Sequence, residues 1–384
     1  RDGVSTRSLF QISNLHHVRQ PHPMLPVNKT GYNYHIDTRR DNLAELSVFL
    51  GEPPTFTDLI DQHADADSYA AYGDVTVPVN DAINIFGGLR YTIDKKRVVT
   101  IGNTNAPGTF FIEDPTGSFV GTGRDKWKAL TWRLGADWHL NSDIMLYASA
   151  SKGYKSGGFQ DTPTDAIDAA ISFNPEYATN FEIGQRATLF DRRVIFNNSL
   201  YFIKYKDLQV RLPTGTGVRA ESAQAEIWGL ESELTWRVGG GFVLGAVYAY
   251  THDRLTRFDT LESGVPVSYA GNRLRSIPAH KLTISPSYTM ALASGAELDF
   301  SADYAYESRI FDDFNNNPRQ TRDPTHFVDA RAVFTTADKR WSFSVWGKNL
   351  TNERTRTFQT DFSGVIFGAF NTPRTYGATL RWKY

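Results

Sequence analysis

The sequence predicts an all-β protein, a transmembrane antiparallel up-and-down β-barrel, from three observations. Apolar and polar residues alternate with period two along many segments. Several segments run for about ten residues or more, close to the ~9–11 that a tilted membrane-spanning strand needs. The links between them are alternately short and long, as expected for strands that turn tightly on one side of a membrane.

The composition excludes several classes of function. The 384-residue chain holds 41 Lys+Arg against 42 Asp+Glu, so no basic excess favours nucleic acid. It has no cysteine, which excludes disulfides, thiolate zinc sites and cysteine nucleophiles. Aromatic residues make up 13% of the chain, yet no apolar stretch approaches the ~18 residues of a membrane helix. The mean hydropathy is negative, as alternating barrel strands allow.

The alternation places apolar residues on one face of each predicted strand and polar residues on the other. It is clearest at 130–140, 229–238, 242–250, 282–288, 298–306, 328–334 and 376–384. An apolar face suits lipid, so the opposite face should line the lumen. The predicted lumen-facing residues are Arg133, Asp137, Glu231, Glu233 and Arg381.

About fourteen strands are expected from about residue 43 onward, joined by links that alternate strictly in length. The predicted short links are 78–81, 141–143, 190–193, 239–241, 292–295 and 336–339. The predicted long links are 96–125, 155–176, 208–221, 253–279, 308–324 and 351–371. A soluble sandwich has no reason to sort its links in this way, so the pattern favours the barrel.

Aromatic residues beside the short links indicate a membrane interface. Tryptophan prefers that height because its ring is apolar and its N–H requires a polar partner. The predicted interface girdle consists of Trp138, Trp236, Trp341, Trp382 and Tyr384.

Two domains are predicted. Residues 46–384 form the barrel, and 1–45 form an irregular or loop segment, or a remnant of earlier barrel strands, because prolines interrupt it. Within the barrel, the strand at 143–154 ends in the glycine-rich stretch 153–159, where the chain turns into a long loop.

Several motifs together resemble the C-terminal barrel of TonB-dependent outer-membrane receptors. They are "YASASKGYKSGGF" at 147–159, "NPEYATNFEIG" at 174–184, "GLESEL" at 229–234, "VWGKNLTNE" at 345–353 and "PRTYGATLRWKY" at 373–384. The hairpin at 72–96 also matches the family, so the resemblance covers roughly residues 68–384.

The resemblance implies a barrel of 22 strands, of which the visible strands are a part, closed by an N-terminal plug domain. Neither a plug nor a TonB-binding segment is seen in the sequence. The implied partners are the outer-membrane lipid, the TonB complex acting through the unseen plug, the barrel assembly machinery and a small-molecule ligand such as a metal chelate. The implied location is the outer membrane of a Gram-negative bacterium.

Candidate ligand-binding residues lie in the long loops, where arginine and lysine could hold a carboxylate or phosphate. They are Tyr154, Lys155, Phe159, Arg273, Arg275, Phe311, Asp312, Asp313 and Phe314. No histidine spacing indicates a metal site, and no catalytic residue or cofactor is predicted, so the protein is not expected to be an enzyme.

Three functions remain open at this point. The preferred hypothesis is a receptor that imports a scarce nutrient such as a ferric siderophore with energy from the inner-membrane TonB complex. The second is a passive fourteen-strand outer-membrane channel for small or hydrophobic solutes. The third is a soluble β-sandwich that acts as a binding module.

Overall fold

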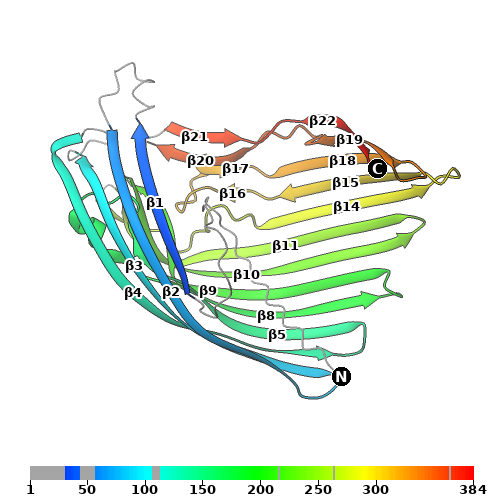
Figure 1. Ribbon diagram of the computed structural model, residues 1–384, viewed down its shortest axis with the longest axis horizontal. Coiled ribbons are helices and arrows are strands. Elements are labelled where there is room, and N and C mark those ends of the chain that lie inside the picture. The colour runs from blue at the N-terminus through cyan, green and yellow to red at the C-terminus, as the bar shows by residue number, and fades with distance from the viewer. Residues whose placement is uncertain (1–30, 44–56, 106–112, 215–216, 263, 363–364) are drawn as a thin grey trace. The chain divides into compact units, whose positions relative to one another are not determined.

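The computed structural model describes residues 31–43, 57–105, 113–214, 217–262, 264–362 and 365–384. Within these residues, fourteen antiparallel strands form one sheet in chain order, and Figure 1 shows them lying side by side. The sheet strands are β1 (Gly31–Leu43), β2 (Thr57–Pro78), β3 (Ile83–Asn105), β4 (Glu113–His139), β5 (Ile144–Lys155), β8 (Glu176–Leu189), β9 (Val194–Thr214), β10 (Gly217–Gly239), β11 (Phe242–Arg257), β14 (His280–Ala291), β15 (Glu297–Glu307), β18 (Thr325–Thr335), β19 (Trp341–Lys348) and β22 (Thr375–Trp382). The predicted all-β, up-and-down architecture is therefore confirmed.

About fourteen strands were predicted from about residue 43 onward; thirteen of the sheet strands lie there, and β1 precedes them. β1 pairs with β2 and lies inside the segment 1–45, for which an irregular structure or a remnant of barrel strands was predicted. Residues 1–30 lie outside the described part of the chain, so the predicted domain boundary near residue 45 stays a prediction.

The register confirms the period-two pattern. On β10 and β11, Leu230 lies opposite Tyr250 and Trp236 lies opposite Leu244, so the apolar residues of both strands share one face. The charged neighbours Glu231 and Glu233 project from the other face, because successive side chains of a strand alternate.

The sheet has two edges, β1 and β22. Among the described residues, no ladder pairs these two strands. A closed fourteen-strand barrel requires that ladder, because an unpaired edge in lipid leaves backbone N–H and C=O groups unsatisfied. The strand order therefore gives no support to the fourteen-strand channel.

The short links are confirmed at one end of the strands, which we call the short-turn end. Tight connections join β2 to β3, β4 to β5, β8 to β9, β10 to β11, β14 to β15 and β18 to β19. The turn from 190 to 193 uses left-handed backbone at Phe190, Asp191 and Arg192. All six connections fall within one or two residues of the predicted positions.

Two of the predicted long links are wrong. The segment 96–125 was expected to be a loop, but β3 continues to Asn105 and β4 begins at Glu113. The segment 208–221 is likewise strand, since β9 ends at Thr214 and β10 begins at Gly217. Ladder bonds join backbone groups and do not depend on lipid, so a strand can continue past the length that a membrane requires.

The other four long links fold into small elements at the opposite, long-loop end (Figure 1). They contain the ladders β6 (Gly158–Phe159) with β7 (Ser172–Phe173), β12 (Asp259–Glu262) with β13 (Val265–Ser268), β16 (Ile310–Phe311) with β17 (Thr321–Arg322) and β20 (Arg356–Phe362) with β21 (Val365–Phe370). The helix α2 (Ala166–Ala170) and the 3₁₀ turn η1 (Pro318–Gln320) complete them. No helix among the described residues is long and apolar enough to cross a membrane.

The buried apolar core also lies at the long-loop end. It joins β9, β10 and β11 to the loops that follow β11 and β15, and it comprises Val210, Ala223, Ala225, Leu255, Phe258, Tyr269, Leu274 and Phe314. A bulge in β9 helps to build it: Asp207 has φ 53°, opposite the register shift between Ala223 and Ala225. The extra residue turns Leu208 and Val210 toward the core.

Candidate ligand-binding site

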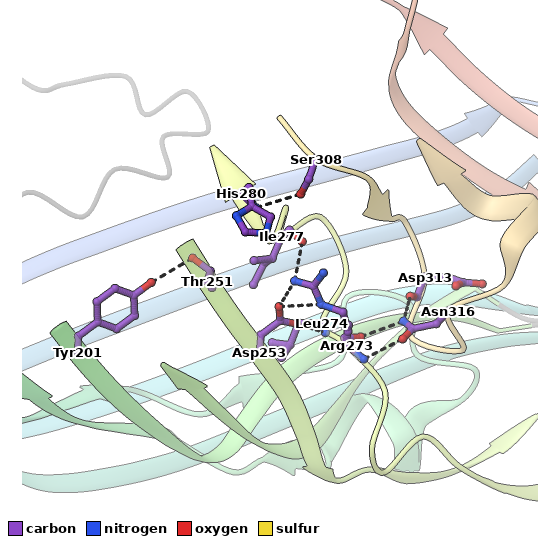
Figure 2. Close-up of polar contacts among 10 residues, drawn as sticks. All are labelled: Tyr201, Thr251, Asp253, Arg273, Leu274, Ile277, His280, Ser308, Asp313 and Asn316. Carbon is purple, nitrogen blue, oxygen red and sulfur yellow. Dashed lines mark hydrogen bonds and ion pairs between the residues drawn. The ribbon is translucent and has the colours of Figure 1, made fainter. Parts of the chain in front are cut away.

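A buried ion pair fixes the loop that follows β11 (Figure 2). Asp253, whose side chain is fully buried, accepts from Arg273 Nη2 at 2.5 Å and from the backbone N–H of Leu274 at 2.5 Å. Arg273 Nη2 also donates to the Ile277 carbonyl at 3.3 Å. Each oxygen of a buried carboxylate thus has a donor, which offsets the cost of burying its charge.

A second clamp joins this loop to the loop between β15 and β18. The Arg273 N–H donates to Asn316 Oδ1 at 2.8 Å, and Asn316 Nδ2 donates to the Arg273 carbonyl at 3.0 Å (Figure 2). Asn316 has φ 55°, a left-handed conformation that asparagine tolerates better than most residues. The two loops are therefore held together directly beside Arg275.

The loop between β5 and β8 is folded onto the sheet by long-range bonds. Gln160 and the backbone of Ala220 exchange two hydrogen bonds, of 2.7 and 3.1 Å. Arg219 Nη1 contacts both oxygens of Asp168, at 2.9 and 3.0 Å. Asp165 caps the start of α2 by accepting from the N–H groups of Ile167 and Asp168. These bonds hold the loop that follows β5 against β10.

Glycines in β4 make room for this loop. A Cβ at Gly121 would lie 2.4 Å from Ala169 Cβ, and one at Gly123 would lie 2.4 Å from the Phe159 ring. Phe159 also packs against Trp127 with ring centroids 6.3 Å apart. Only glycine allows the loop to lie this close to β4.

These loops and strands enclose a cavity of about 430 Å³ at the long-loop end. Residues from several strands and loops line it: Lys96, Lys155, Ser156, Asp161, Phe173, Leu208, Gln209, Val210, Arg211, Ala220, Leu274, Arg275 and Phe314. Its volume is within the range of small-molecule sites.

Positive charge dominates the lining. Four cationic side chains, Lys96, Lys155, Arg211 and Arg275, face one carboxylate, that of Asp161, which forms an ion pair with Arg211. Within the part of the chain that the structure describes, Lys155 has no ion-pair partner. Its cross-strand neighbour Glu176 accepts from the Gln209 N–H at 2.9 Å. The residues that line the cavity therefore carry a net positive charge.

The cations also affect one another. Burial lowers the pKa of Lys96; the charge of Asp94 opposes this lowering and that of Lys155 adds to it. Burial likewise lowers the pKa of Arg275 although solvent reaches its side chain; the charge of Asp312 opposes this lowering and that of Arg211 adds to it. About ten strand residues are enough to cross a membrane. Lys96 lies farther than that along β3 from the short-turn end, and Arg275 lies in the loop that follows β11. Like charges held together in this way favour binding of an anion.

The predicted ligand-binding residues separate into two groups. Lys155, Arg275 and Phe314 line the cavity, and the Arg275 guanidinium lies 5.2 Å from the centre of the Phe314 ring. The others make contacts within the protein. Arg273 is held by Asp253, Asp312 pairs with Arg322 at 2.9 Å, and Asp313 accepts from the Asn317 N–H at 3.2 Å.

Three aromatic candidates also support the loops. Phe159 packs on Trp127, and the Tyr154 ring lies 5.6 Å from that of Tyr177. The Phe311 carbonyl accepts from the Ser276 N–H at 2.7 Å. Ligand binding by any of the nine candidates stays a prediction.

The lumen and girdle assignments stay predictions. Arg133 donates to both oxygens of Asp74, at 2.5 and 2.6 Å, on the face opposite Leu134. Trp341 and Trp382 lie opposite each other near the short-turn end, with ring centroids 6.1 Å apart. The other residues of the predicted lumen set are Asp137, Glu231, Glu233 and Arg381. The other residues of the predicted girdle are Trp138, Trp236 and Tyr384.

Sequence reasoning missed Lys96, Arg211, Asp161 and Phe173 as lining residues. The first two lie in segments that were interpreted as solvated loop, and nothing in one sequence shows that these segments face Arg275. Among the described residues, no group of three or more His, Cys, Asp or Glu side chains could hold a metal ion. His16, His17 and His22 lie outside the described residues.

Comparison with known proteins gives concordant matches. The model of a family described as "TonB dependent receptor-like, beta-barrel" matches residues 6–350. The pesticin receptor of Yersinia pestis is 25% identical over 317 residues, which cover 82% of this chain and 44% of the receptor. The metal-pseudopaline receptor CntO of Pseudomonas aeruginosa is 24% identical over 161 residues, covering 42% of this chain and 21% of that receptor.

Solved structures share the fold. The ferric yersiniabactin uptake receptor FyuA from Yersinia pestis superposes with a TM-score of 0.75 at 22% identity, covering 92% of this chain and 50% of that one. The siderophore receptor PiuA from Acinetobacter baumannii gives a TM-score of 0.65 at 17% identity, with 87% and 46% covered. The chain thus spans about half the length of the pesticin receptor and of FyuA.

Proposed function

Because the chain belongs to the TonB-dependent receptor β-barrel family, we propose that it supplies transmembrane strands to an outer-membrane receptor that imports a scarce nutrient. The nutrient is a metal chelate such as a ferric siderophore. The names of the relatives support this choice, since they include receptors for metal–pseudopaline and ferric yersiniabactin. The protein acts as a transporter rather than an enzyme.

In this proposal the short-turn end faces the periplasm and the long-loop end faces the outside of a Gram-negative cell. Barrels of this class have short periplasmic turns and longer external loops. The apolar face of the strands contacts outer-membrane lipid, and a TonB complex in the inner membrane supplies the energy through a plug. The barrel assembly machinery inserts the chain.

One observation carries the proposal: the cationic cavity of about 430 Å³ at the long-loop end. It lies where an external ligand would arrive first, and its loops are fixed by the Asp253–Arg273 and Gln160–Ala220 contacts. A rigid, charged and concave surface is suited to capture a scarce solute before transport.

The test is uptake of radioactive iron by cells that express the full gene product. We expect uptake from a ferric chelate that stops when the TonB complex is deleted or the proton gradient is collapsed. Uptake that is unchanged in cells without TonB would contradict the energised receptor and favour the passive channel. Labelling of an epitope inserted at 161–168 on intact cells checks the orientation independently.

A further inference from the structure

We propose that the cavity selects an anionic chelate, whose oxygens replace the Asp161 carboxylate as the partner of Arg211. This inference rests on the proposed function and adds to it the charge class of the ligand and a residue that competes with it. Asp161 is thereby a specificity-determining residue. It lowers the affinity for every anion that must displace it.

The charge balance of the lining is the first support. The four cations Lys96, Lys155, Arg211 and Arg275 and the single carboxylate leave a net positive cavity. Among the acidic groups outside the lining, Asp168 holds Arg219, Asp312 holds Arg322 and also acts on Arg275, and Asp94 acts on Lys96, so the four cations still outnumber the carboxylates near them. A ligand with several carboxylate or phenolate oxygens would supply the missing negative charge.

The distribution of donors is the second support. Arg211 projects from β9, Arg275 from the loop after β11 and Lys155 from the end of β5, so the cations converge from separate segments on one volume. Lys96 Nζ is oriented by the Gly157 carbonyl at 2.7 Å and lies 5.6 Å from the centre of the Trp127 ring. A compact ligand could be contacted from several sides at once.

The environment of Asp161 is the third support. Its side chain is 28% exposed and that of Arg211 is 58% exposed, so solvent reaches this ion pair. Exposed pairs contribute little to stability, in contrast to the fully buried Asp253 pair. An incoming carboxylate can therefore exchange with Asp161 at Arg211 without unfolding the loop, which Gln160 and Asp168 still hold to β10.

The aromatic residues in the lining restrict the ligand further. Phe173 and Phe314 border the cavity, and Phe314 already stacks against the Arg275 guanidinium at 5.2 Å. A flat, partly apolar group beside the anionic oxygens would contact these rings. A ferric catecholate combines both features and serves as the probe.

The experiment compares two chelates that differ chiefly in charge. Ferric tris-catecholate is anionic and ferric tris-hydroxamate is neutral. Binding to the purified full receptor in detergent is followed by quenching of tryptophan fluorescence, for which Trp127 is favourably placed beside Lys96. Retention of the fold is checked by heat-modifiable gel migration.

Removing a cation from the cavity and removing its carboxylate should have opposite effects on catecholate binding. Lys155→Gln should weaken catecholate binding about tenfold, the loss of one charge-assisted contact, and Asp161→Asn should strengthen it several-fold. Lys128→Gln is the matched control, since Lys128 is exposed in β4 outside the cavity and should have no effect. Raising the salt concentration should weaken binding to the wild type.

Three results would overturn the inference: equal or tighter binding of the neutral chelate, no binding of either chelate, or weaker catecholate binding by Asp161→Asn. These outcomes differ from failure of the proposed function, because binding in detergent needs no TonB. Catecholate binding with the expected charge dependence but no energised uptake would refute only the transport proposal.

Discussion

At the scale of single residues, the loops at the site are held by a few side chains that no neighbouring residue could replace. Asp253 and Arg273 illustrate this. The carboxylate is fully buried, and the arginine that neutralises it also donates a backbone N–H to Asn316. One pair thus fixes the loop after β11 both to the sheet and to the next loop.

Removing Arg273 should therefore destabilise the loops more than removing an exposed arginine nearby. We expect Arg273→Ala to cost about 3–5 kcal/mol, because it leaves the Asp253 charge buried and unpaired. Arg309→Ala is the control. Arg309 lies 3.7 Å from an exposed Asp323 and should contribute about 0–1 kcal/mol. Urea unfolding in detergent, with proteolysis of 268–279 as a local measure, distinguishes the two, and equal costs would refute the role of the pair.

A glycine gives a second prediction at this scale. Gly121→Ala should displace α2 from β4, because the new Cβ would lie 2.4 Å from Ala169 Cβ. Amide hydrogen exchange of 166–170 should become faster. Gly73→Ala is the control, since no atom lies within 4 Å of the Cβ position there. Unchanged exchange in Gly121→Ala would show that α2 does not pack against β4 as described.

At the scale of elements, the two faces of a sheet strand differ in composition, and in the proposed receptor they meet different solvents. On β4, Leu134 lies opposite Gly87 and Ala150 and is 58% exposed, as a residue in contact with lipid would be. Its neighbour Arg133 projects to the other side and pairs with Asp74. The alternation, rather than the total apolar content, therefore defines the membrane-facing surface.

Adding a charge to the apolar face and removing one from the polar face should change the free energy of unfolding by different amounts. Leu134→Arg should destabilise the barrel by about 2–4 kcal/mol if the residue is near the bilayer midplane. Arg133→Leu should cost less, since it removes only a half-exposed ion pair worth about 0–1 kcal/mol. The measurement is reversible unfolding in lipid vesicles. Equal costs would disprove the assignment of the faces.

At the scale of the whole molecule, β22 forms one edge of the described sheet. It pairs with β19 over eight residues, and its apolar stripe of Tyr376, Leu380, Trp382 and Tyr384 is exposed on the outward face. In the proposed receptor this strand is both a recognition element for the assembly machinery and part of the closing ladder.

Deleting 382–384 should therefore abolish outer-membrane insertion and leave aggregated or degraded protein in the periplasm, because the edge backbone would be unsatisfied in lipid. The control replaces Arg381 and Lys383 with Gln. This double variant changes the same segment but keeps the apolar stripe and the backbone, so it should insert normally. Cell fractionation at matched expression compares the two. Normal insertion of the truncated chain would contradict the role of β22.

The sequence by itself determined the local properties of this protein. Period two set the strands and their faces, as at 376–384, and turn residues such as Gly239 to Gly241 set the short-turn end. Motifs such as 147–159 pointed to the family that the comparisons support. These features could be predicted because alternation and turn chemistry act between residues that are neighbours in the chain.

Only the tertiary structure decided how far the strands extend and what the long loops build. Residues 96–125 and 208–221 were predicted to be long links, and only the structure showed that β3, β4, β9 and β10 extend into these segments. The sequence also could not separate Arg275, which lines the cavity, from Arg273, which is bound to Asp253. That difference depends on contacts between segments that are far apart in the chain, such as Lys96 with Gly157 and Arg211 with Asp161. Such contacts follow from packing in three dimensions, and a local pattern carries no information about them.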